Sequence, residues 1–260
     1  MINLIHGELY KYKKSLALKI CILITMVCAV LLAVLSNGNA VGTMNIPANS
    51  LSGLSDIFIM SVVGTLMASL IICGDFESKD MHDAISCGRR NIVVSKSIGY
   101  FIVIALLVLP YAITAFIGFI TKGQFQATFS YSTYLTLMSN QSGVPVNAES
   151  IGKSIEVLLI SIVLYAARLS FCIPLAFKIK KAVVVTVAGV VLGFLSDFFV
   201  NLLSKVPVLD TILEYTPFAH PIVTMDMSHG ELIKILVISL SFFVFMIILT
   251  NILFKKDEIK

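Results

Sequence analysis

Charged side chains are rare in this sequence, so the two that fall deep inside apolar stretches are the first candidates for chemistry. Arg168 and Asp197 each lie well inside an apolar run. A charge in hydrocarbon is costly, and such residues commonly pair with one another or line a substrate path. If the two runs are helical neighbours, a rise of 1.5 Å per residue places the two side chains at depths about 7 Å apart. We therefore expect either an Arg168–Asp197 pair or separate roles, with Asp197 at the outer interface and Arg168 snorkelling or on a substrate path.

The sequence lacks the residue patterns that usually support catalysis or metal binding. His220, Asp226 and His229 are close along the chain, but their spacing matches no metal motif. There is no HExxH, no CxxC and no GxxxxGK[ST] phosphate loop. We expect no disulfide, no metal, no catalytic residue and no cofactor in this chain.

The composition identifies the elements that must position any functional residue. Of 260 residues, 58% are hydrophobic and only 13% are charged, against about 45–50% and about 25% in soluble domains. Six apolar runs are separated by short polar segments, and most have about the 20 residues that a membrane-spanning helix requires. The sequence predicts an all-α polytopic membrane protein, one domain over residues 1–260, with six transmembrane helices. The runs are Leu16–Leu35, Ile57–Cys73, Ile98–Ile120, Ile155–Phe177, Ala182–Leu203 and Ile233–Phe254.

The basic residues predict the orientation of these runs. With the chain ends assigned to one side, that side carries 14 Lys and Arg residues, whereas the other carries Lys122, Lys153, Lys205 and Lys234. Because basic residues concentrate on the cytoplasmic side, we expect both termini in the cytoplasm. A cleaved signal peptide is not expected, since the first apolar run is long and follows a polar segment of 14 residues.

The first 15 residues predict an amphipathic helix on the inner leaflet, with Glu8 turned away from its apolar face. The alternative is a poorly ordered basic lead-in. The apolar face would consist of Ile2, Ile5, Leu9, Tyr12 and Leu16.

The loop over residues 75–97 predicts a second cytoplasmic helix. Asp75 or Ser78 can cap its start, and Gly88 can end it in a left-handed conformation. Met81 and Ile85 then share one face, which forms a small apolar knob with a charged rim. Such a feature suits protein docking; the alternative is a solvated loop that its basic residues hold at the inner leaflet.

This loop resembles the coupling loop of type-two ABC exporter permeases, in particular those of the bacitracin-resistance and lantibiotic-immunity type. The N-terminal Glu8-Leu9-Tyr10-Lys11 and the six predicted spans are also similar to that family, so the resemblance covers nearly the whole chain. The sequence departs from the family pattern at Lys79-Asp80, where Gly-Thr is usual, and at Arg89, where Ser is usual. The loop residues that match are Phe76, Ile85, Gly88, Arg90, Val93 or Val94, Ser95 and Lys96.

The resemblance implies that the loop helix docks into a separate ATP-binding subunit, which holds the ATP and magnesium. Two such subunits and a second permease chain, identical or related, would complete an exporter of an amphipathic peptide, antibiotic or other membrane-active compound in a bacterial cell membrane. The alternative function is a non-transporting immunity, scaffold or sensor protein. The residues implied in ATPase coupling are Glu77, Met81, Ile85, Gly88, Arg90 and Lys96.

Two further features concern packing and the outer face. Gly189 and Gly193 form a GxxxG pattern that permits close helix approach, either between two chains or within one.

The segments 121–150 and 206–230 are half-apolar, rich in aromatic residues and too broken to span the membrane. We expect them at the outer surface, as an interfacial cap or an outer gate, and 206–230 resembles the re-entrant helices of the family.

The topology makes a labelling prediction. A membrane-impermeant thiol reagent should modify a Ser142→Cys variant in intact cells but leave the native Cys87 unmodified. Permeabilised cells serve as the control, because both thiols should then react. Labelling of Cys87 alone in intact cells would reverse the orientation.

Overall fold

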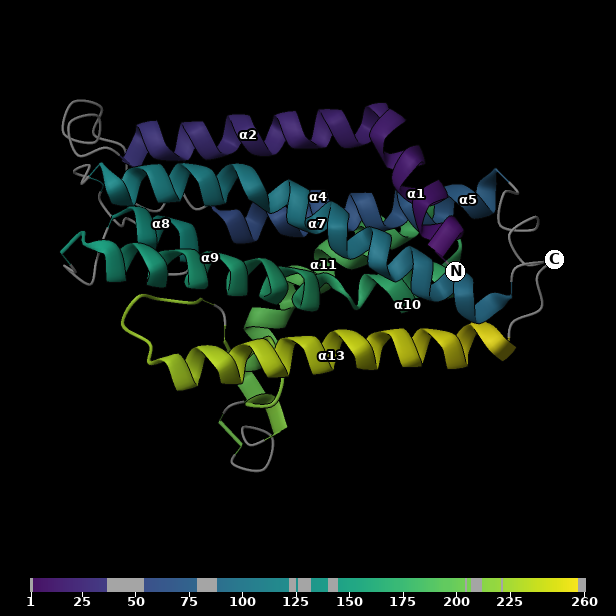
Figure 1. Ribbon diagram of the computed structural model, residues 1–260. Helices are drawn as coiled ribbons and strands as arrows, with labels where there is room; N and C mark the ends of the chain where they lie inside the picture. The colour runs from purple at the N-terminus through teal and green to yellow at the C-terminus, as the bar shows by residue number, and fades with distance from the viewer. Residues whose placement is uncertain are drawn as a thin grey trace.

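The computed structural model of the chain is a bundle of helices (Figure 1). It describes residues 2–36, 54–78, 88–121, 125, 132–139, 145–203, 205–206, 212–220 and 222–256. Over these residues the fold is all-α, as predicted. The elements are α1 (Ile2–Lys14), α2 (Leu16–Ser36), α4 (Asp56–Ala68), the π-helix η2 (Ser69–Cys73), α5 (Gly74–Glu77), α7 (Arg89–Ile120), α8 (Thr133–Met138), α9 (Ala148–Leu169), α10 (Cys172–Ile179), α11 (Ala182–Leu203) and α13 (His229–Lys256).

Five helical stretches are long and apolar enough to cross a membrane: Leu16–Ser36, Asp56–Glu77, Arg89–Ile120, Ala148–Ile179 and His229–Lys255. These indicate a multi-pass membrane protein. The expected fifth run is α11, whose apolar part, Ala182–Ser196, is shorter. Helix α11 also runs obliquely to the other long helices (Figure 1). Six spans therefore remain a prediction.

The fourth apolar run begins earlier than expected and is broken near its end. Asn147 caps α9 in a reciprocal capping box with Ser150, so the helix starts seven residues before Ile155. Pro174 explains the break between α9 and α10, because proline lacks an N–H and its ring clashes with the carbonyl four residues earlier, here that of Ser170. That carbonyl accepts from the backbone N–H of Ile173 instead (3.0 Å).

We had expected the whole segment 121–150 at the outer membrane surface, but part of it lies inside the bundle. All six residues of α8 are buried, and the helix packs between α7 and α9. The Tyr134 hydroxyl bonds the Ser161 hydroxyl (2.8 Å), and Thr133 accepts from the backbone N–H of Val223 (3.1 Å). Because its polar groups find partners inside the bundle, α8 is part of the core.

The GxxxG pattern of α11 packs within the chain, against α4. A Cβ on Gly189 would lie 2.8 Å from the Thr65 methyl group, and one on Gly193 would lie 3.4 Å from Ser61. Ser69 and Thr186 add an interhelical hydrogen bond of 2.7 Å. Small residues thus bring the two backbones close, and the hydroxyl pair fixes their register.

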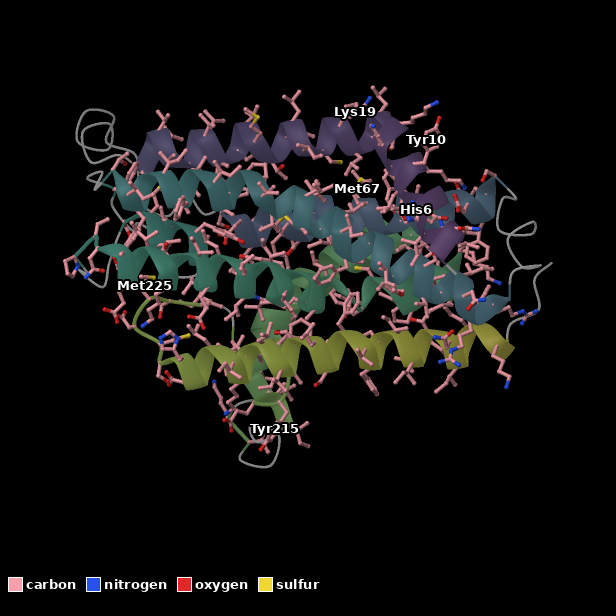
Figure 2. The ribbon with its side chains drawn as sticks, viewed as in Figure 1. His6, Tyr10, Lys19, Met67, Tyr215 and Met225 are labelled. Carbon is pink, nitrogen blue, oxygen red and sulfur yellow. The ribbon has the colours of Figure 1, made fainter. Side chains whose placement is uncertain are left out.

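The two ends of the bundle differ in content. Helices α1 and α5, the start of α7 and the end of α13 lie at one end, and α8 and the start of α13 lie at the other (Figure 1). Figure 2 shows His6 and Tyr10 at the first end, Met225 at the second, and Tyr215 projecting beyond α13. The side chain of Tyr215 is 68% exposed, and the location of the 206–230 segment at the outer surface remains a prediction.

The α4–α11 contact yields a stability prediction. Gly189→Ala should lower the free energy of unfolding by about 1–3 kcal/mol, since the added methyl overpacks the contact with Thr65. Gly152→Ala is the matched control, because nothing lies within 4 Å of a Cβ there. Thermal unfolding in detergent measures both. A Gly189→Ala variant that keeps its melting temperature but changes its oligomeric state would instead assign this face to a dimer.

Candidate functional site

Two buried polar clusters lie in the described part of the chain, one near each end of the helix formed by α4, η2 and α5. We define the α1 cluster as Glu8, Tyr12, Asp75 and Lys96. We define the Asp56 cluster as Asp56, Ser132, Tyr134, Ser161 and Tyr165.

The α1 cluster is centred on the ammonium group of Lys96. The Lys96 side chain is only 3% exposed. Its Nζ donates to Glu8 Oε2 (2.7 Å), to the Ile71 carbonyl (3.1 Å) and to Asp75 Oδ2. An ammonium has three donors, and each finds an acceptor on a different element. One side chain of α7 thereby fastens α1, η2 and α5 together.

The carboxylates of Glu8 and Asp75 neutralise the charge of this lysine, and each carboxylate has a further contact. Lys11, which is half-exposed, approaches Asp75 at 3.5 Å, and the Tyr12 hydroxyl donates to Glu8 Oε2 (3.1 Å). Burial, the charge of Glu8 and the hydrogen bond to it raise the pKa of Tyr12 well above its usual value. Tyr12 therefore remains a protonated donor.

The close approach of α1 to α7 depends on a glycine. A Cβ on Gly99 would lie 2.6 Å from the Tyr12 hydroxyl oxygen, so a larger residue would push α1 away. We had expected Glu8 to be turned away from the apolar face of α1 that includes Tyr12. Instead Glu8 and Tyr12 are both buried and hydrogen-bonded to each other, because the Lys96 charge requires a counter-ion inside.

The π-helix η2 shapes the path of the chain to this cluster. The backbone N–H of Gly74 bonds the Ser69 carbonyl, five residues back. Within this wider turn, the Ile71 carbonyl accepts a hydrogen bond from Lys96. π-Turns of this kind occur frequently at functional sites. Here η2 directly precedes Asp75, which the same lysine binds.

Aromatic packing holds α5 against the C-terminal half of the chain. The Phe76 ring lies 5.9 Å from the Phe177 ring and 6.2 Å from the Phe254 ring, both edge-on. The exposed Glu77 carboxylate accepts from the backbone N–H of Ala182 (3.2 Å) at the first residue of α11. The predicted coupling residue Glu77 thus supports a helix start within the chain.

The other predicted coupling residues are distributed around the connection that follows. Gly88 has a φ of +93°, which favours glycine, and it directly precedes α7. Helix α7 begins at Arg89, so only residues 78–88 separate it from α5, fewer than the 75–97 loop we expected. Arg90 is exposed, and Lys96 is buried in the α1 cluster. Met81 and Ile85 lie outside the described residues.

The Asp56 cluster lies toward the other end of α4. Asp56 is fully buried in the first turn of α4, and its Oδ2 accepts from the Tyr165 hydroxyl (2.5 Å). The Ser132 side chain and the backbone N–H groups of Asp56 and Ile57 also stabilise this carboxylate. Among the described residues, Asp56 Oδ1 has no hydrogen-bond partner. A buried carboxylate in an apolar helix bundle is chemically suited to accept a proton or a cationic group.

Arg168 lies one helical turn beyond Tyr165 on α9. It is 6% exposed, and its guanidinium lies 5.7 Å from the centre of the Phe218 ring. Arg168, Tyr165 and Phe218 line a cavity of about 20 Å³ between α4, α9, α11 and the segment 212–220. Arg168 is therefore inside the bundle and beside the Asp56 cluster. The Asp197 side chain lies outside the described part, so the predicted Arg168–Asp197 pair remains a prediction.

Sequence reasoning missed Asp56 and Tyr165 as site residues. The available signals were an acidic residue at the start of an apolar run and a tyrosine three residues before the intramembrane arginine. No cluster of three His, Cys, Asp or Glu side chains suited to a metal occurs in the described part. Neither models of known protein families nor curated proteins match this sequence.

The α1 cluster makes a prediction about Lys96. Lys96→Met leaves the buried carboxylate of Glu8 and the partly buried carboxylate of Asp75 without their shared cation, and breaking a buried pair in this way commonly costs about 3–5 kcal/mol. We expect faster hydrogen–deuterium exchange over residues 2–14 and a lower melting temperature. Lys11→Met, which removes a half-exposed charge, should change both measurements little. Equal exchange in the two variants would show that α1 does not depend on Lys96.

Proposed function

We propose that this chain is the membrane-spanning permease subunit of an ATP-binding cassette exporter. In this proposal it moves an amphipathic peptide, antibiotic or other membrane-active compound out of a bacterial cell. ATP would be hydrolysed by a separate subunit, present in two copies, and a second permease chain, identical or related, would complete the assembly. Helix α11 would be the sixth span, and both termini would be cytoplasmic.

The observation that carries the proposal is the α1 cluster. A surface helix and the base of the 78–88 connection are fastened by one buried lysine, and aromatic packing and Glu77 join the same base to α10, α11 and α13. A protein docked on α1 and on this connection would therefore move most of the bundle. Such an arrangement supports a mechanical role better than a chemical one.

The Asp56 cluster supplies a candidate substrate path. Its cavity beside Arg168 has a volume of about 20 Å³, which is room for about one water molecule. A peptide requires far more space, so transport would need α11 and the 212–220 segment to separate from α9. The buried carboxylate, the arginine and the tyrosine rings would then contact a substrate that has both charged and apolar groups.

The first experiment tests whether the chain binds a separate ATP-binding subunit. The chain should be co-expressed with an ATP-binding cassette protein encoded beside it in the genome, purified in detergent and assayed for ATPase activity. We expect the two proteins to co-purify and the chain alone to hydrolyse no ATP. Purified chain that stays free of the co-expressed ATPase would favour a scaffold or sensor instead.

A second experiment tests the docking residues. Met81→Asp and Ile85→Asp should weaken partner binding by about 30-fold or uncouple ATP hydrolysis from transport, because losing a central apolar contact commonly costs about 2 kcal/mol. Lys79→Ala, on the predicted rim, is the matched control and should have little effect. Insertion into the membrane should be normal in all three variants. If both aspartate variants behave like the control, the connection is not a docking element.

A further inference from the structure

A large groove runs between α7 and α13, at the end of the bundle where α1 also lies (Figure 1). Its volume is about 840 Å³, within the range of about 300–1,000 Å³ typical of ligand sites. It is separate from both polar clusters. Its lining changes from basic to apolar along its length, and this change identifies what it can hold.

The basic end is formed by Arg89 and Arg90 of α7 and by Asn251 and Lys255 of α13. Arg89 donates to the carbonyls of Phe254 (3.3 Å) and Lys255 (3.2 Å), which are among those left without partners at a helix end. It thereby joins the two helices. Arg90 and Lys255 are exposed. The first turn of α7 contains no acidic residue, so the positive end of its dipole adds to these charges.

The rest of the groove is apolar. It is lined by Val94 of α7 and, along α13, by Val244, Ile247, Ile248 and Ile252. Val244, Ile248 and Ile252 are each more than half exposed. Val244 and Lys255 are eleven positions apart, which corresponds to about 16 Å along α13 at 1.5 Å per residue. One leaflet of the hydrocarbon core is about 15 Å deep, half of about 30 Å, so the whole groove has about the depth of one leaflet.

We propose that this groove binds an anionic phospholipid of the inner leaflet. Its phosphate would lie against Arg90 and Lys255, and one acyl chain would lie along Ile248 and Val244. Basic pockets between helices on the cytoplasmic side are suited to anionic headgroups. A free phosphate would leave the apolar part unused, and an apolar helix of another chain would not need the cations. The inference goes beyond the proposed function. It takes from that proposal only the orientation of the chain, with both termini in the cytoplasm.

Native mass spectrometry tests the proposal with the full chain. The protein should be exposed to equal amounts of phosphatidylglycerol and phosphatidylcholine that have identical acyl chains. We expect preferential retention of phosphatidylglycerol. R90Q and K255Q should each lower that retention about fivefold, as expected for about 1 kcal/mol per basic residue, without changing retention of phosphatidylcholine. K13Q removes an exposed lysine of α1 outside the groove and should have no effect.

A third variant tests the apolar part. I248W places a bulky ring in the groove at an exposed position, so it should fold and should lower retention of both lipids. Equal retention of the two lipids by the unmodified chain, or unchanged retention in R90Q and K255Q, would overturn the proposal. A shift of oligomeric state in I248W with lipid retention intact would also overturn it, because the groove would then be a contact between chains. None of these readouts depends on ATPase activity or transport.

Discussion

The end of the bundle that contains α1 is organised by one buried cation. Lys96 is almost inaccessible to solvent and has two carboxylates and a carbonyl around its ammonium. Burying a charge is costly unless it is paired and hydrogen-bonded, so Glu8 and Asp75 cannot leave without a large loss of stability. The bond to Glu8 fixes the position of α1, and the glycine at position 99 permits the close approach of Tyr12 on that helix. The lysine thus determines how three elements meet.

Hydropathy predicted the long helices because length and apolar content are local properties. The runs Leu16–Leu35 and Ile233–Phe254 correspond closely to α2 and α13. Hydropathy does not report how a helix is rotated or which helix lies beside it. The pairs Glu8–Lys96 and Asp56–Tyr165 join residues 88 and 109 positions apart, and no local pattern relates them. Pro174 did give a local signal for the break after α9.

The two polar clusters share one structural element. Asp56 begins the helical stretch Asp56–Glu77, and Asp75 lies near its end. The two acids are nineteen positions apart, which corresponds to about 28 Å at 1.5 Å per residue, most of the hydrocarbon thickness of about 30 Å. Both acids bind side chains of other helices, Tyr165 of α9 and Lys96 of α7. A displacement along this stretch would therefore change hydrogen bonds at both ends at once.

The π-helix η2 is the place where such a displacement can be absorbed or transmitted. It lies between the two acids, and its Ser69 bonds Thr186 of α11, while its Ile71 carbonyl bonds Lys96. A shift of η2 toward regular α-helix would move the Ile71 carbonyl relative to the lysine. It would also rotate Asp75 relative to Asp56, because the number of residues per turn changes. The lysine that holds α1 in place through Glu8 thus also opposes a change in helix register between the two clusters, through its bonds to η2 and α5.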